Sequence, residues 1–295
     1  MRIYLNNNFV SEQNAVISVF DHGFLYGDGA FETLRAYGGR LFRLRQHLRR
    51  LKESAQGLEI SLPHTFPVLG RLLYQTLSVN HLENALLRVC VSRGRGPIGL
   101  DPALCRKPTF VIIPRVFNGY GPHKYHNGLE ITVVSVRRTP RQALDPKIKS
   151  SNFLNNILAK IQAKRNHSHE GLMLSVNGHL TEGSISNFFI VKRGRLYTPG
   201  VNLDILPGIT RGLVVDLAKE SGIPVKETRL RPSDLYNADE CFLTNTSMEV
   251  MPVVKADGFT IGGGKPGPIT RLLQELYRKT VRRECQIRMR PSRAK

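Results

Sequence analysis

The sequence predicts an α/β (α+β) protein of two domains, in which strands and helices are mixed along the chain. Its 295 residues are enough to build two domains of ordinary size, each with its own core. Apolar residues make up 41% of the chain and charged residues 22%, as in ordinary globular proteins. Short apolar runs typical of strands alternate with segments in which apolar residues recur every three or four positions, as on one face of a helix.

A small N-terminal domain is expected over residues 1–117. Residues 3–10 predict a hairpin, and Leu44–Leu58 predicts an amphipathic helix. The apolar run Ala85–Ser92 predicts a buried strand with one charged residue, Arg88, in its middle. A lone charge in an apolar run needs a partner, so Arg88 should either form an internal ion pair or point into a cavity.

The glycines and the proline of residues 118–128 predict an interdomain linker. A larger domain is expected over residues 129–283, with a helix that begins after Gly208. Residues 284–295 are basic and are expected to form a disordered tail.

The segment around Lys149 is the centre of the predicted site. Pro146 disfavours helix before it, whereas Ser150–Asn152 favour a helix start. Lys149 should therefore lie just before a helix N-terminus, whose positive partial charges favour a neutral amine that can form an imine with an aldehyde. Lys147 is the competing lysine, and a purely structural role stays open. The following apolar stripe, which is expected to be buried, consists of Phe153, Leu154, Ile157, Leu158 and Ile161.

Six segments, taken in order, carry a resemblance to a known family. They are Ser18–Thr33, His47–Leu51, Lys149–Asn152, Glu182–Gly183, Leu206–Arg211 and Thr244–Val250. From about Ile3 to about Tyr277 the chain resembles the class IV aminotransferases, pyridoxal-phosphate enzymes of fold type IV. This family includes branched-chain aminotransferases, D-amino-acid aminotransferases and aminodeoxychorismate lyases. The resemblance implies pyridoxal 5′-phosphate at the domain interface and a homodimer.

The resemblance also implies roles for individual residues. Lys149 would be the catalytic lysine that holds the cofactor as an imine, Glu182 would pair with the pyridine nitrogen, and Arg50 would bind the phosphate. The other implied cofactor-binding residues are Ser184, Ile185, Leu206, Ile209, Thr210, Asn245 and Thr246. The implied substrate-binding residues are Tyr26, Phe31, Arg88 and Met248.

Two reactions remain open for such a site. We favour amino transfer between an apolar, branched-chain-like amino acid and 2-oxoglutarate, because Arg88 and Gly99–Pro102 match the branched-chain enzymes. Ile98 and Leu100 stand where the D-amino-acid enzymes carry an arginine and a histidine for the substrate carboxylate, which argues against a D-amino-acid aminotransferase. Leu86 departs from the branched-chain pattern, which has a tyrosine there, and such departures favour the alternative, an aminodeoxychorismate lyase that forms 4-aminobenzoate and pyruvate.

The net charge of +20 is the unusual global feature of the chain. Clustered Lys and Arg attract nucleic-acid phosphates, but much of the excess lies from Arg278 onward and no nucleic-acid-binding motif accompanies it. We therefore expect small-molecule amino-acid and 2-oxo-acid substrates and no specific nucleic acid. A non-catalytic basic binding protein is the remote alternative.

The sequence also predicts the compartment. No run of about 18 apolar residues is present, so no membrane span is expected. The N-terminal residues Arg2–Asn6 predict a strand and a turn instead of a signal peptide. The four cysteines lie far apart without C-x-x-C spacing, which favours free thiols in a cytoplasmic protein and no metal site.

Overall fold

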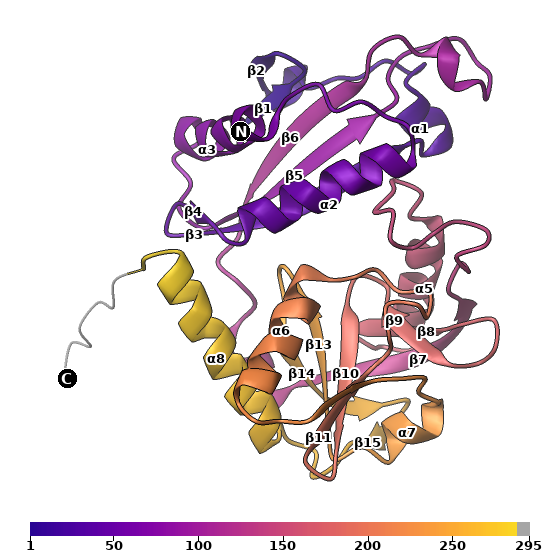
Figure 1. The fold of residues 1–295 in the computed structure, drawn as a ribbon, viewed down its shortest axis with the longest axis vertical. Helices are drawn as coiled ribbons and strands as arrows, with labels where there is room; N and C mark the ends of the chain where they lie inside the picture. Colours follow the sequence, from indigo (N-terminus) through magenta and orange to yellow (C-terminus); the bar gives the residue numbers. More distant parts are fainter. Residues whose placement is uncertain (288–295) are drawn as a thin grey trace.

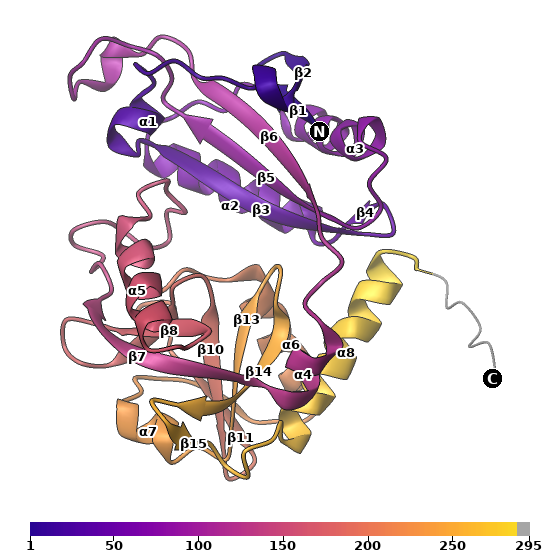
Figure 2. The ribbon, with the colours of Figure 1, turned by 180° about the vertical axis from the view of Figure 1, so that it is seen from behind.

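The computed structural model describes residues 1–287 and consists of two β-sheets with helices packed around them (Figure 1). Residues up to Val116 form the first sheet, and residues from Leu129 onward form the second. The first sheet lies above the second in both views (Figures 1 and 2). The mixed α/β class predicted from the sequence is confirmed.

The first sheet is antiparallel. Its strands are β1 (Arg2–Leu5), β2 (Asn8–Ser11), β3 (Gly29–Tyr37), β4 (Arg40–Leu41), β5 (Ala85–Ser92) and β6 (Thr109–Val116). Their order is β2-β1-β6-β5-β3-β4. The predicted hairpin and the predicted strand around Arg88 are therefore confirmed as β1–β2 and β5.

Two long helices, α2 (Leu44–Gly57) and α3 (Phe66–Val79), pack against the first sheet. The apolar stripe of α2 is buried through Leu48, Leu51 and Ala55, so the predicted amphipathic helix is confirmed. The shorter elements of this half are the helix α1 (His22–Tyr26) and the 3₁₀ turns η1 (Glu12–Asn14) and η2 (Pro102–Leu104).

Residues 117–128 connect the two sheets and contain the short helix α4 (Pro122–Asn127). Gly119 and Gly128 adopt φ values of +90° and +80°, conformations that favour glycine, where the chain turns into and out of this segment. The division of the chain into domains at these boundaries stays a prediction.

The second sheet mixes parallel and antiparallel pairs. Its strands are β7 (Leu129–Arg137), β8 (Glu170–Leu174), β9 (Leu180–Gly183), β10 (Asn187–Lys192), β11 (Arg195–Thr198), β12 (Val225–Glu227), β13 (Glu240–Asn245), β14 (Glu249–Ala256) and β15 (Phe259–Thr260). Their order is β12-β11-β10-β13-β14-β7-β8-β9, with β15 paired to β14. Strand β7 pairs in parallel with both β8 and β14.

Both faces of the second sheet are buried. The helices of this half are α5 (Leu154–Arg165), α6 (Ile209–Glu220), α7 (Pro232–Tyr236) and α8 (Pro268–Glu284). On one face, Phe189 and Phe242 pack with α6 and α8, whereas Phe188 and Leu243 belong to a second cluster with Leu235 of α7. The alternation follows from the two-residue period of the strands. The predicted helix after Gly208 is confirmed as α6.

The apolar stripe of helix α5, which was predicted to be buried, faces outward. Leu154, Ile157, Leu158 and Ile161 are all exposed, between 41% and 63%. The helix packs on β7 and β8 through small and polar side chains instead, namely Asn156, Ala159 and Ala163. Close approach of the helix to the sheet requires small side chains, so the large ones face outward.

The C-terminal helix α8 extends to Glu284, and Cys285 after it is buried. The rest of the tail that was expected to be disordered, residues 288–295, lies outside the described residues. No helix within residues 1–287 is long and apolar enough to cross a membrane.

Candidate active site

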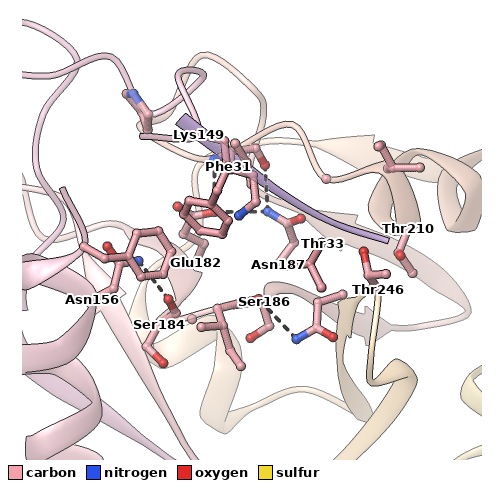
Figure 3. Close-up of a pocket in the computed structure, with 18 of the residues that line it drawn as sticks. Phe31, Thr33, Lys149, Asn156, Glu182, Ser184, Ser186, Asn187, Thr210 and Thr246 are labelled. Carbon is pink, nitrogen blue, oxygen red and sulfur yellow. Dashed lines mark hydrogen bonds between the residues drawn. The ribbon is translucent and has the colours of Figure 1, made fainter. Parts of the chain in front are cut away.

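A cavity of about 320 Å³ is lined by residues of both sheets (Figure 3). The first sheet contributes Phe31 and Thr33 from β3, and Arg88 from β5. The opposite wall comes from the segment around Lys149 and from the residues that follow Glu182. Twelve of the fourteen residues predicted from the sequence line it: Phe31, Arg50, Arg88, Lys149, Glu182, Ser184, Ile185, Leu206, Ile209, Thr210, Asn245 and Thr246.

Lys149 lies in the segment between β7 and α5, and its backbone is held by the other half of the molecule. Its N–H donates to Ser54 Oγ at 3.0 Å, and its carbonyl accepts from the N–H of Phe31 at 3.0 Å. The amine nitrogen is 4.2 Å from the centre of the Phe31 ring and 5.5 Å from that of Phe153. Lys147, the competing lysine, is exposed and does not line the cavity.

The pKa of Lys149 is lowered to about 8, first by burial and then by the positive charge of Arg50. The physical cause therefore differs from the expected helix dipole. Helix α5 begins only at Leu154, because Ser150 and Ser151 pair with the start of β3 instead of capping a helix. The lowered pKa nevertheless increases the fraction of neutral, nucleophilic amine near neutral pH.

Glu182 is the penultimate residue of β9, and both oxygens of its carboxylate accept hydrogen bonds. Oε1 accepts from Nε of Arg138 at 2.8 Å, and Oε2 accepts from the N–H of Leu206 at 3.0 Å and from Nδ2 of Asn187 at 3.2 Å. Burial raises the pKa of Glu182, although Arg138 and the Leu206 N–H oppose this effect. Sequence reasoning missed Arg138 and Asn187, since only the fold brings them to Glu182.

Arg50 of α2 is anchored by a buried carboxylate. Its Nε and Nη2 donate to the two oxygens of Glu32 at 2.6 and 3.0 Å, and Nη1 donates to the carbonyl of Pro207 at 3.1 Å. His47 Nδ1 also lies 2.8 Å from Glu32. Burial alone would raise the pKa of Glu32, but Arg50 and His47 hold it well below its usual range. The remaining N–H groups of Arg50 are free to bind an anion in the cavity.

The N-terminus of α6 forms a second group of donors. Ile209 and Thr210 open this helix and line the cavity, and the first N–H groups of a helix have no partner within it. Thr246 lies near Thr210 in Figure 3, away from Lys149. The buried hydroxyl of Thr244, which also lines the cavity, has no hydrogen-bond partner within residues 1–287. This end of the cavity suits a phosphate group.

Asn245 shapes the turn between β13 and β14. Its Oδ1 accepts from the N–H groups of Ser247 and Met248, at 2.9 and 2.6 Å, and its Nδ2 donates to the carbonyl of Ile185 at 3.1 Å. The Asn245 amide is therefore occupied by bonds within the protein, although the residue itself lines the cavity. The turn directs Met248 into the core, where it is 5% exposed and does not line the cavity. The predicted contact of Met248 with the substrate stays a prediction that this geometry does not support.

Ser184 lies at the cavity wall, but its donors point away from it. Both its hydroxyl and its N–H donate to Oε1 of Glu170, a buried carboxylate, and the hydroxyl of Ser186 donates to Oε2 at 3.1 Å. Asn156 of α5 donates to the Ser184 carbonyl at 2.8 Å (Figure 3). Glu170 and Asn156 thus hold the segment after Glu182 in place. The hydroxyl proton of Ser184 is already donated to Glu170, so it is not free to bind a ligand.

Tyr26 does not line the cavity of its own chain. It is 36% exposed, and its hydroxyl accepts from the N–H of Gly99 at 3.1 Å. The loop of Gly99 also carries Ile98 and Leu100, which are 74% and 83% exposed. Tyr26 therefore does not face the cavity formed by its own chain, and its predicted contact with the substrate stays a prediction.

Two arginines give the cavity a positive wall. The guanidinium of Arg88 lies 3.7 Å from the centre of the Phe31 ring, and Arg115 of β6 also lines the cavity. No carboxylate among the described residues forms an ion pair with either arginine, whereas Arg50 and Arg138 each have one. Arg115 was missed because it stands near the polar end of its strand. Arg115 pairs with Leu86 of β5, and this pairing depends on the register of the two strands, which the sequence alone does not give.

Known proteins resemble the chain along almost its full length. The family described as amino-transferase class IV matches residues 29–256. A Methanocaldococcus jannaschii protein named "Putative branched-chain-amino-acid aminotransferase" is 46% identical over 98% of this chain and 99% of its own length. The D-alanine aminotransferase of Staphylococcus haemolyticus is 34% identical over 95% of this chain and 98% of its own.

Solved structures agree with the fold. The T.th. branched-chain amino acid aminotransferase, solved with pyridoxamine 5′-phosphate, superposes with a TM-score of 0.91 and 31% identity, over 95% of this chain and 93% of that one. The Escherichia coli branched-chain amino acid aminotransferase gives a TM-score of 0.91 and 32% identity, over 94% and 93% of the two chains.

Proposed function

The chain belongs to the class IV aminotransferases, which depend on pyridoxal 5′-phosphate, and from that premise we propose that it transfers an amino group between an apolar, branched-chain-like amino acid and 2-oxoglutarate. The observation that carries the proposal is the buried amine of Lys149, with a pKa lowered to about 8, in the same cavity as Glu182.

The residues of the cavity fit this cofactor. Lys149 would hold its aldehyde carbon and Glu182 its ring nitrogen. The free N–H groups of Arg50, the N-terminus of α6 and the hydroxyl of Thr246 would hold its phosphate. The unpartnered hydroxyl of Thr244 supports the fit, because a buried hydroxyl normally has a partner. When bound, the cofactor supplies an electron sink for bond breaking at the substrate α-carbon.

The protein's own contribution is to hold and move protons. The amine of Lys149 can take a proton from the substrate α-carbon and return it, because a pKa of about 8 lies near the working pH. Phe31 and Phe153 stand beside the amine and exclude water. Arg138 and Asn187 hold the Glu182 carboxylate in one orientation, so that it can keep a ring nitrogen protonated.

The cavity lining supports both kinds of substrate. Phe31, Leu86 and Phe153 offer an apolar wall for a branched side chain. Arg88 and Arg115, which have no internal ion pair among the described residues, would bind the distal carboxylate of 2-oxoglutarate. The names of the M. jannaschii, T.th. and E. coli proteins support the same substrate class.

A homodimer is part of the proposal. The apolar stripe of α5 is exposed, and so are Val16, Val19 and Phe24 around α1. Helices α1 and α5 lie on the same side of the molecule in both views (Figures 1 and 2), and a Cβ at Gly27 would be 3.4 Å from Asn152. A second copy of the chain on this face would cover the stripe.

The test is a visible absorbance spectrum of the purified protein, before and after addition of L-leucine and 2-oxoglutarate. We expect a cofactor band that leucine shifts, with glutamate as product, and no such band in Lys149→Ala; Lys147→Ala is the matched control. A wild-type protein without a band, or one that releases pyruvate from aminodeoxychorismate and ignores leucine, would contradict the proposal. D-leucine as donor tests the handedness.

A further inference from the structure

One face of α2 connects the phosphate end of the cavity with the catalytic lysine. His47, Arg50 and Ser54 follow at intervals of three and four residues, so they lie on the same side of the helix. All three are buried. Arg50 reaches Glu32 and the carbonyl of Pro207, and Ser54 accepts the backbone N–H of Lys149 at 3.0 Å.

The contact of Ser54 with Lys149 crosses between parts of the chain that are far apart in sequence. Ser54 is 1% exposed, so water cannot readily replace its hydroxyl as the acceptor. The end of α2 also packs closely on the residue before Lys149: a Cβ at Gly57 would lie 2.9 Å from Cδ1 of Ile148. A glycine at this position therefore permits the helix to approach the lysine segment.

The carbonyl of Lys149 is held from the same half of the molecule, by the N–H of Phe31. Residue 31 precedes Glu32, the carboxylate that anchors Arg50. The backbone N–H and C=O of Lys149 and the guanidinium of Arg50 are therefore all held by the same two elements, β3 and α2. The hydroxyl of Ser54 is the member of this unit that fixes the lysine N–H.

We propose that Ser54 is a positioning residue for the reaction: its hydroxyl holds the Lys149 backbone against α2, so that the amine stays desolvated and in register with the phosphate-binding Arg50. The inference rests on the proposed role of Lys149 as the catalytic lysine. Without the hydroxyl, the partly buried N–H of Lys149 lacks an acceptor from the protein, and the segment relaxes toward water to find one. The amine then becomes hydrated and misplaced.

The first measurement needs no cofactor. In the apo full-length chain, the rate of Lys149 modification by acetic anhydride, followed by mass spectrometry, gives the midpoint of amine deprotonation. Arg50, Arg88, Glu32 and Glu182 are the charged groups that act on this amine, and the titratable His47 of α2 is also close enough to interact with it. Ser54→Ala should raise the midpoint from about 8 toward the ordinary lysine value, by about one pH unit. Ser54→Thr, which keeps a hydroxyl, should restore it.

The second measurement is steady-state kinetics of the loaded enzyme. Ser54→Ala should lower kcat about tenfold and change KM for leucine less than about twofold, because misplacement affects the reacting geometry more than binding. Ser54→Cys, with its weaker acceptor, should fall between wild type and Ser54→Ala, and it serves if the alanine variant does not fold.

The matched control is Thr76→Val. Thr76 is a fully buried hydroxyl of α3 that donates to the Leu72 carbonyl at 2.8 Å, remote from the cavity lining. If Ser54→Ala lowers only the unfolding temperature, as Thr76→Val should, with labelling midpoint and kcat unchanged, the inference is wrong. If Lys149→Ala retains activity, the proposed function fails instead, so the two failures are distinguishable.

Discussion

Glu249 on β14 accepts a hydrogen bond of 2.7 Å from Nη1 of Arg35 on β3, so that a buried ion pair joins the two sheets. The same arginine nitrogen donates to the carbonyl of Ser247 at 3.1 Å, and the hydroxyl of Tyr37 donates to the carboxylate at 3.0 Å. Glu249 adopts a φ of +58°, a conformation that is unfavourable for a non-glycine residue and that the pair holds in place. The turn bearing Thr246 is thus fixed from the other sheet.

Arg35→Met should lower the free energy of unfolding by about 3–5 kcal/mol, because it removes the close, buried cation from the Glu249 carboxylate and leaves only the half-exposed Arg278 at 3.8 Å. Urea denaturation of the apo protein measures this loss. Arg49→Gln is the control, because its pair with Glu53 is exposed and should contribute about 0–1 kcal/mol. Equal losses in the two variants would show that the inter-sheet pair does not stabilise the fold.

Arg115→Met should raise KM for 2-oxoglutarate about tenfold and leave KM for leucine almost unchanged. An exposed guanidinium that binds a distal carboxylate contributes through a charge-assisted hydrogen bond, and leucine has no such group. Arg88→Met should act in the same direction. The check is steady-state kinetics with each substrate varied in turn, and Arg71→Met on α3, away from the cavity lining, is the control. A proportional rise of both KM values would argue against a carboxylate contact.

The lowered pKa of Lys149 should make the stability of the apo protein depend on pH. The folded pKa is about 8 and the unfolded value is 10.5, so between these values the unfolded state binds more protons. The contribution of Lys149 to stability therefore rises with pH through this window, and below about pH 8 its buried charge destabilises the fold. Lys149→Met should remove the dependence.

The measurement is the difference in unfolding free energy between wild type and Lys149→Met, taken at several values from about pH 7 to about pH 11. We expect Lys149→Met to be the more stable protein near pH 7, with a difference that shrinks as the pH rises. A difference that is constant with pH would mean that the amine titrates alike in the folded and unfolded states.

Leu158→Glu should weaken or abolish the proposed dimer, because it places a charge in the exposed stripe of α5. Sedimentation velocity at several protein concentrations measures the mass. Val79→Glu is the control. Val79 is an exposed apolar residue at the end of α3, and α3 and α1 lie at opposite sides of the first sheet (Figures 1 and 2). A wild-type protein that sediments as a monomer would refute the dimer itself.

The sequence by itself determined the class of fold, the order of the main elements and most of the residues around the cavity. The periodic stripe of α2 and the apolar run of β5 are local patterns, and local patterns report which residues face a core. The family motifs then selected Lys149 over Lys147, a choice that the burial of the two residues favours.

Only the tertiary structure decided how those residues are used. The stripe of α5 has the period of a buried face, yet it points outward because Ala159 and Ala163 allow closer packing on the sheet. The carboxylate partners of Arg50 and Arg138, the acceptor for the Lys149 N–H and the outward position of Tyr26 all depend on contacts between distant segments. Periodicity carries no information about such contacts, since they are fixed by which strands pair and how the two sheets meet.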